Sequence, residues 1–173
     1  KLKDIYITSF GGHQVTFVGK GVKPKLHLED NWLSYFSPES KRIFIKKLGQ
    51  KLLGPSVKIK NIVNPYFSPE VIMISETIIL FTDINESGLA ELIKYDIKTK
   101  TRSLVYTSEH LEENLEICYY NDQLFLGKFS INKSQRNSSI VSFSKDNIEP
   151  EKETPIYQSN QNDIGNLICN YKK

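Results

Sequence analysis

Residues 71–107 decide the fold, and they read VIMISETIILFTDINESGLAELIKYDIKTKTRSLVYT. Short apolar runs in this stretch alternate with Ser, Asn, Asp and Gly, which is typical of β-strands joined by tight turns. Gly88 supplies the positive φ that a turn at 85–88 needs, and the polar residues near 98–101 form the tip of a second hairpin. The stretch therefore predicts one four-stranded antiparallel sheet, with strands at 71–75, 77–82, 90–97 and 103–107.

The rest of the chain has the same pattern and almost no helical periodicity. One short polar stretch, 109–115, is the exception, and it is compatible with a single helical turn. A tight hairpin turn is expected at 10–13, where two Gly occur together. The pattern predicts an all-β protein with further strands at 4–9, 14–18, 25–28, 32–37, 42–48, 57–59, 115–120, 123–129, 140–144, 155–158 and 166–170.

An aromatic residue marks the same strand of successive units: Tyr6, Phe44, Tyr95 and Phe143. The intervals are 38, 51 and 48 residues, and the four-stranded blades of a β-propeller repeat about every 40 to 50 residues. The sequence thus predicts a single β-propeller domain or propeller fragment over residues 1–173, with about three full blades and partial ones. Because three blades and fragments leave open sheet edges, we expect the remainder of a longer or processed chain, or another segment, to complete it. Closure as four blades is the alternative.

A second repeat is the pentapeptide Tyr-Phe-Ser-Pro-Glu, at 35–39 and again at 66–70. The interval of 31 residues is too short for one blade, so either one blade is abbreviated or the two copies lie at non-equivalent places; we favour the second.

Four successive elements of the sequence together resemble a blade of the TolB-like six-bladed propellers. They are residues 66–70, the apolar strand 78–82, the strand 92–96 that ends in Asp, and the closing strand 104–106. Residues 4–7 before Gly11 and Gly12 resemble the third strand of the same unit. The Gly that usually follows the Ser-Pro-acidic element is replaced by Ser40 and Val71. The resemblance implies an extracytoplasmic protein, periplasmic or secreted, and Asn-x-Ser/Thr sequons at Asn85, Asn132 and Asn137 agree with this.

The charge argues against nucleic acid as a partner. The formal net charge is only +3, from 23 basic and 20 acidic residues. Just three of the basic residues are Arg, whose guanidinium group best forms paired hydrogen bonds with phosphates and bases. No run of apolar residues approaches the 18 or so that a membrane-spanning helix needs, so we predict no membrane span.

One loop has the donor pattern of a metal site. Residues 83–91 read D-x-N-x-S-G-x-x-E, with oxygen donors at alternate positions, and resemble the strand-loop-strand calcium loops of some propellers. The expected ligands are the carboxylates of Asp83 and Glu91, the side-chain oxygens of Asn85 and Ser87, and the carbonyl of Leu89. The alternative is a bulged hairpin with a polar tip, which favours the same residue types.

No catalytic constellation is recognisable. The histidines His13, His27 and His110 stand alone in the sequence, and there is no Gly-x-Ser-x-Gly element. Cys118 and Cys169 lie in apolar runs and lack metal-ligand spacing; buried free thiols are the first interpretation, and a disulfide in an oxidising compartment is the second. The aromatic residues Trp32, Tyr35, Phe36, Tyr66 and Phe67 are expected mostly to fill the space between blades. The alternative is that some of them line an exposed platform for a glycan or peptide.

The sequence therefore predicts a non-catalytic β-propeller that binds a protein, peptide or glycan partner or serves as a scaffold. The alternative is the accessory or catalytic propeller portion of a hydrolase or lyase, of the prolyl-oligopeptidase or polysaccharide-cleaving type, with its catalytic residues elsewhere in a longer chain.

Overall fold

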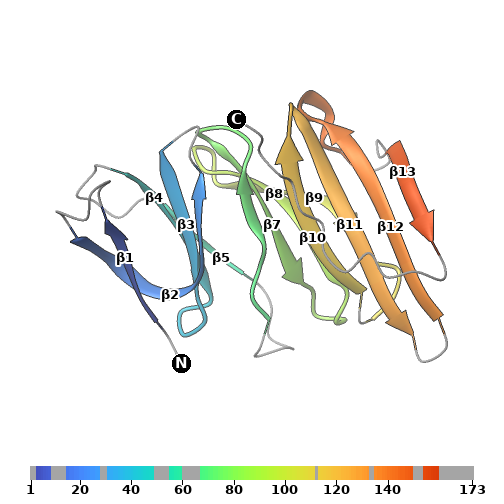
Figure 1. The fold of residues 1–173 in the computed structure, drawn as a ribbon, viewed down its shortest axis with the longest axis horizontal. Coiled ribbons are helices and arrows are strands. Elements are labelled where there is room, and N and C mark those ends of the chain that lie inside the picture. The colour runs from blue at the N-terminus through green and yellow to red at the C-terminus, as the bar shows by residue number, and fades with distance from the viewer. Residues whose placement is uncertain are drawn as a thin grey trace. The chain divides into compact units, whose positions relative to one another are not determined.

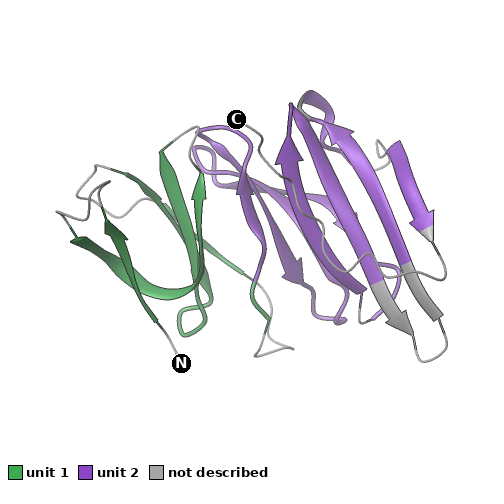
Figure 2. Cartoon of the chain, in the orientation of Figure 1, with its two compact units in different colours: residues 1–60, 65–68 green, residues 61–64, 69–173 purple. Residues whose placement is uncertain are grey.

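The computed structural model describes residues 3–8, 15–27, 31–48, 55–59, 67–111, 113–132, 135–149 and 154–159. The chain divides into two compact units, and each is described by itself (Figure 2). Unit 1 contains Lys1–Lys60 and Pro65–Ser68, and unit 2 contains Asn61–Asn64 and Pro69–Lys173. The described strands form three antiparallel sheets, one in unit 1 and two in unit 2 (Figure 1). The all-β prediction is confirmed.

Unit 1 is a five-stranded meander in the order β1-β2-β3-β4-β5. Its middle strands carry buried aliphatic and aromatic residues on both faces: Tyr35 and Phe36 are buried, whereas Trp32 is half-buried. The strands are β1 (Lys3–Thr8), β2 (Val15–His27), β3 (Trp32–Ser37), β4 (Arg42–Lys47) and β5 (Ser56–Lys58).

Strand β2 corrects one prediction, because the strands expected at 14–18 and 25–28 form one bent element. Its first half pairs with β1 up to Gly21, and its second half pairs with β3 from Val22 onward. The bend lies at Lys23, whose φ is 48°, and Figure 1 shows the resulting curvature. The partial unit and the first full unit predicted from the sequence therefore share a strand, which makes one sheet of five.

Two glycines let β2 run close to Tyr35. A Cβ on Gly19 would collide with the ring and hydroxyl of Tyr35, and a Cβ on Gly21 would stand 2.5 Å from the carbonyl oxygen of Phe36. Tyr35 stacks on its cross-strand neighbour Phe44, with ring centroids 5.2 Å apart, and burial raises the pKa of its phenol. One hydrophobic cluster of unit 1 contains Ile5, Val18, Leu33 and Tyr35, with Ile7, Phe44 and Leu48 packed against it.

The first sheet of unit 2 is the one predicted from residues 71–107. Its strands are β6 (Val71–Met73), β7 (Ile78–Ile84), β8 (Ala90–Asp96) and β9 (Thr101–Thr107), paired in chain order. Gly88 in the turn between β7 and β8 has φ of 84°. In the turn between β8 and β9, the Asp96 carboxylate accepts hydrogen bonds from the amides of Lys98 and Thr99. Both predicted hairpins are confirmed.

The second sheet of unit 2 contains β10 (Glu113–Tyr120), β11 (Gln123–Asn132), β12 (Gln135–Ser144) and β13 (Thr154–Ser159), again in chain order. A short 3-10 helix, Lys145–Asn147, follows β12. The helical turn expected at 109–115 is wrong, because residues 108–111 form a bend and β10 begins at Glu113. Leu115 and Ile117 both enter the core with the period of two that a strand gives.

The two sheets of unit 2 pack face to face. Their shared core takes Ile72, Leu80 and Leu92 from the first sheet, and Leu124 and Leu126 from the second. Leu80, Leu92, Leu124 and Leu126 are fully buried, and burying one such side chain contributes about 1.5–3 kcal/mol. Aliphatic packing between consecutive sheets is therefore what holds unit 2 together.

Three of the four aromatic markers occupy equivalent strands. The fourth prediction is wrong, because Tyr6 lies in β1, the first strand of the same sheet as Phe44. Phe44, Tyr95 and Phe143 lie in β4, β8 and β12, each the last strand but one of its sheet. The two copies of the pentapeptide are not equivalent, because Tyr35 to Ser37 end β3 whereas residues 67–70 precede β6 without regular structure. Tyr66, the turn at 10–13 and the strand expected at 166–170 lie outside the described residues.

Candidate functional site

The predicted calcium loop is the turn between β7 and β8. Asp83 and Glu91 are directly opposed cross-strand partners, so their carboxylates lie on the same face of the sheet. Asp83 is only 1% exposed, and one of its carboxylate oxygens accepts a hydrogen bond of 2.9 Å from the amide of Ile84. The structure thus brings the two expected carboxylate ligands together.

Asn85 organises the turn. Its side-chain oxygen accepts hydrogen bonds of 3.0 Å from the amides of Ser87 and Leu89. Its side-chain nitrogen donates to the carboxylate of Glu91 at 3.1 Å. The oxygen that would bind calcium is therefore turned toward the backbone of the loop, and the amino group is turned toward the carboxylate.

Ser87 and Leu89 complete the loop. Ser87 is exposed at the tip, and the carbonyl of Leu89 accepts a hydrogen bond of 2.9 Å from the amide of Asn85. Within the part of the chain that the structure describes, no three His, Cys, Asp or Glu side chains are grouped to hold a metal. The hydrogen bonds favour the polar hairpin tip, and calcium at Asp83, Asn85, Ser87, Leu89 and Glu91 stays a prediction.

A second polar cluster joins the two sheets of unit 2. The Tyr106 hydroxyl, from β9, donates a hydrogen bond of 2.9 Å to the Glu113 carboxylate, from β10. The Lys128 ammonium, from β11, lies 4.1 Å from the centroid of the Tyr106 ring, a cation–π contact. Burial raises the pKa of Glu113, and the Tyr106 hydrogen bond together with the charges of Lys128 and His110 partly offsets this effect.

The sequence contains no signal for this cluster. Its three members come from three strands and two sheets, and the pattern of each strand indicates only which residues point inward. A carboxyl group with a raised pKa beside a cation and a phenol is the kind of arrangement found at functional sites, although ion-pair networks with a structural role produce it too.

The turn at Asn85 and the cluster at Tyr106 belong to one end of the sheets, which we call the loop end. It comprises residues 83–91 and 106–111 together with Glu113. The amide of Ala90 donates to the Ser108 hydroxyl at 2.8 Å, and that hydroxyl donates to the carbonyl of His110 at 3.1 Å. Leu111 packs against Gly88. The loop end exposes the side chains of Glu86, Ser87, Glu109, His110 and Leu111.

A second histidine with a defined partner lies in unit 1. His27, in unit 1, lies 2.9 Å from the Ser34 hydroxyl through its Nε2 atom, although the sequence offered it no partner. Burial, with a smaller contribution from Lys25, lowers its pKa to about 4, so its ring is neutral at pH 7. Ser34 is 1% exposed, and its contact with His27 connects β2 with β3. His13 lies outside the described residues.

Cys118 is buried in β10 and disulfide-bonded, which makes the free-thiol interpretation wrong for this residue. The sequence has one other cysteine, Cys169, which lies outside the described residues.

Comparison of the chain with models of protein families finds no match, and comparison with curated proteins finds no similar protein. In the described part of the chain, no helix has the length and apolar character needed to cross a membrane.

Proposed function

We propose that this chain is a β-propeller module of the TolB-like kind, without catalytic activity of its own, that binds a protein, peptide or glycan partner through its loop end. One observation carries the proposal: consecutive four-stranded meanders, with an aromatic residue in the last strand but one of each sheet, bury their faces on one another in unit 2. Sheets stacked in chain order in this way are the building pattern of a propeller. Crystallography or cryo-electron microscopy of the purified protein is the direct test: we expect the sheets to be arranged radially about a common axis, and a closed two-layer sandwich would contradict the proposal.

The loop end supports the binding role. A rigid stack of sheets holds the turn at Asn85 and the segment 108–111 side by side through the Ser108 hydrogen bonds. The exposed side chains there include two carboxylates, one imidazole and the apolar Leu111, a mixture suited to recognition of a partner that offers both hydrogen bonds and apolar surface. The disulfide at Cys118 supports an extracytoplasmic location.

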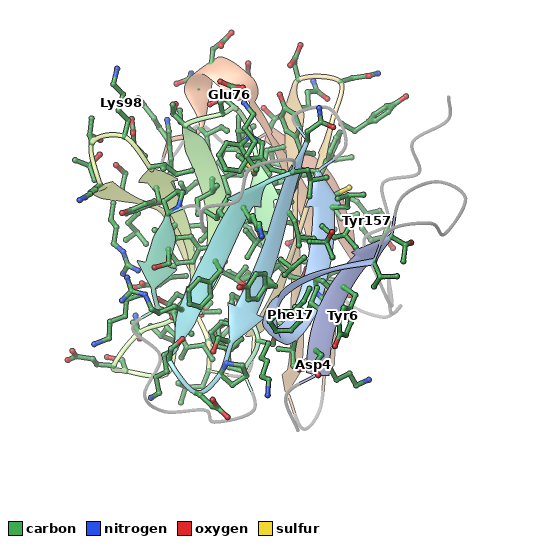
Figure 3. All side chains as sticks on the ribbon, turned by 90° about the vertical axis from the view of Figure 1, so that its left-hand side faces the viewer. Asp4, Tyr6, Phe17, Glu76, Lys98 and Tyr157 are labelled. Carbon is green, nitrogen blue, oxygen red and sulfur yellow. The ribbon has the colours of Figure 1, made fainter. Side chains whose placement is uncertain are left out.

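The binding test uses a phage library of random peptides and an array of purified glycans. We expect ligands selected on the wild-type protein to lose about tenfold or more in affinity on the variants Glu109→Gln and His110→Ala. The matched control is Glu76→Gln, with Lys98→Ala beside it, because both residues are exposed in turns at the opposite end of the same sheet (Figure 3). These control variants should bind as the wild type does.

Two results would contradict the proposal. One is an equal loss of affinity on the Glu76 and Glu109 variants, which would place recognition elsewhere. The other is turnover of peptide or polysaccharide substrates by the purified protein, which would favour the hydrolase or lyase alternative.

A further inference from the structure

The outer face of β1 and β2 carries exposed apolar side chains. Tyr6, Val15 and Phe17 are 55%, 62% and 51% exposed. Ile5 and Val18, on the opposite side of the same strands, are buried in the core of unit 1. Exposed aromatic residues that adjoin one another on a folded surface commonly mark a place where another molecule docks.

The two rings lie side by side on the strands. Tyr6 and Phe17 are cross-strand partners, their ring centroids are 5.5 Å apart, and their planes meet at 60° (Figure 3). Coplanar rings would offer a flat platform for the face of a sugar, whereas rings at this angle leave a ridged surface. Such a surface fits the side chains of another protein face better than it fits a glycan.

Charged residues flank the rings. Asp4 and Lys20 form the neighbouring cross-strand pair, with the carboxylate oxygen and the ammonium nitrogen 3.9 Å apart and both side chains about half exposed or more. The face therefore has an apolar centre and, at one end, one acid beside one base, with no net charge. A face of this kind is complementary to itself, because a two-fold rotation can bring the acid of one copy to the base of the other.

We propose that this face, formed by Asp4, Tyr6, Thr8, Val15, Phe17 and Lys20, is a homodimer interface. Two copies stack their β1 and β2 strands about a two-fold axis, with the rings at the centre and Asp4 of each copy opposite Lys20 of the other. The inference does not depend on the binding role of the loop end. Because six residues form the face, fewer than the roughly 20–30 per partner of a standard stable interface, we expect a reversible dimer with a dissociation constant on the order of tens of micromolar.

Sedimentation velocity over a concentration series tests the interface. The wild-type protein should shift from monomer to dimer across the micromolar range, and Phe17→Glu should remain monomeric throughout. The matched control is Leu111→Glu, which places the same charge on an exposed apolar residue of unit 2 and should dimerise as the wild type does. Circular dichroism of each variant verifies that it is folded, and Tyr6→Ser is a milder second variant.

A charge exchange tests the arrangement of the two copies. Asp4→Lys and Lys20→Asp should each weaken the dimer about tenfold or more, and the double variant should restore it. A wild-type protein that stays monomeric at all concentrations overturns the proposal, as does a dimer that survives Phe17→Glu. Failure of the double variant to restore dimerisation also overturns it, and so does a monomer that binds glycans through Phe17.

Discussion

The Tyr106 hydroxyl reaches from the last strand of one sheet to the Glu113 carboxylate in the first strand of the next, at 2.9 Å. The two residues are only seven positions apart, and the chain between them passes through the exposed segment 109–111. The hydrogen bond therefore links the two sheets of unit 2 where the chain passes from β9 to β10.

Removing the Tyr106 hydroxyl should destabilise the contact between the two sheets of unit 2. We expect Tyr106→Phe to lower the free energy of unfolding by about 1–2 kcal/mol, because a hydrogen bond to a partly buried carboxylate is lost while the ring still packs under Lys128. Urea unfolding of Tyr106→Phe, Glu113→Gln and the double variant measures the coupling. Additive effects would show that the two side chains do not interact.

Glu113 should make stability depend on pH. Burial raises the pKa of its carboxyl above the ordinary 4.5, so the folded state favours the protonated form. Its contribution to stability is fully present below pH 4.5 and is lost as the pH rises through the raised pKa. In Glu113→Gln this loss should disappear, which unfolding curves between pH 4 and pH 7 can establish. Identical pH profiles for the variant and the wild type would contradict the assignment.

His27 should make stability depend on pH in the opposite direction to Glu113, with a loss at low pH. Burial, and to a lesser extent Lys25, lowers its pKa from 6.5 to about 4. The neutral ring stabilises the fold above pH 6.5, and this contribution, at most about 3 kcal/mol, is lost as the pH falls toward 4. His27→Gln should flatten that part of the stability profile. A direct check is the NMR titration of the ring, which should report a midpoint far below 6.5.

The shared core of unit 2 should be sensitive to truncation. Leu124 is fully buried between the two sheets, and Leu124→Ala should lower the free energy of unfolding by about 2–5 kcal/mol through lost burial and the cavity left behind. Leu104→Ala is the control, because Leu104 is about half exposed on β9 and its truncation should change stability by about 0.5 kcal/mol or less. Similar losses in both variants would argue against face-to-face packing.

Calcium can be tested by thermal unfolding. The Asn85 oxygen is engaged by two backbone amides, so calcium binding would require the turn to open. We expect millimolar calcium to change the melting temperature of chelator-treated protein by no more than about 1 °C. A larger rise that Asp83→Ala abolishes would instead establish the metal site that the sequence pattern suggests.

Much of the fold could be read from local patterns. The strands of residues 71–107 follow from apolar runs and turn residues, because pairing between neighbours in a meander depends on short turns such as the one at Gly88. The bend in β2 could not be read in this way. It lies at Lys23, a non-glycine residue with a positive φ, and nothing in the local sequence marks that conformation. The close approach of Gly19 and Gly21 to Tyr35 is equally hidden, because a glycine at the end of a strand looks the same in sequence.

The candidate site was predictable only in part. Asp83 and Glu91 are brought together by the same hairpin that their spacing indicated, whereas the orientation of the Asn85 amide depends on the backbone of the folded turn. Nothing in the local pattern pairs Tyr106 with Glu113, or His27 with Ser34, because each pair depends on how strands or sheets are placed.

By itself, the sequence determined the all-β class of the protein and the order of the strands that short hairpins join, because alternation and turn chemistry act over a few residues. Only the tertiary structure decided which polar groups meet, which aromatic rings remain on the surface and that Cys118 is disulfide-bonded. Those outcomes depend on distances between segments far apart in the chain, and burial and electrostatic interactions are set by these distances.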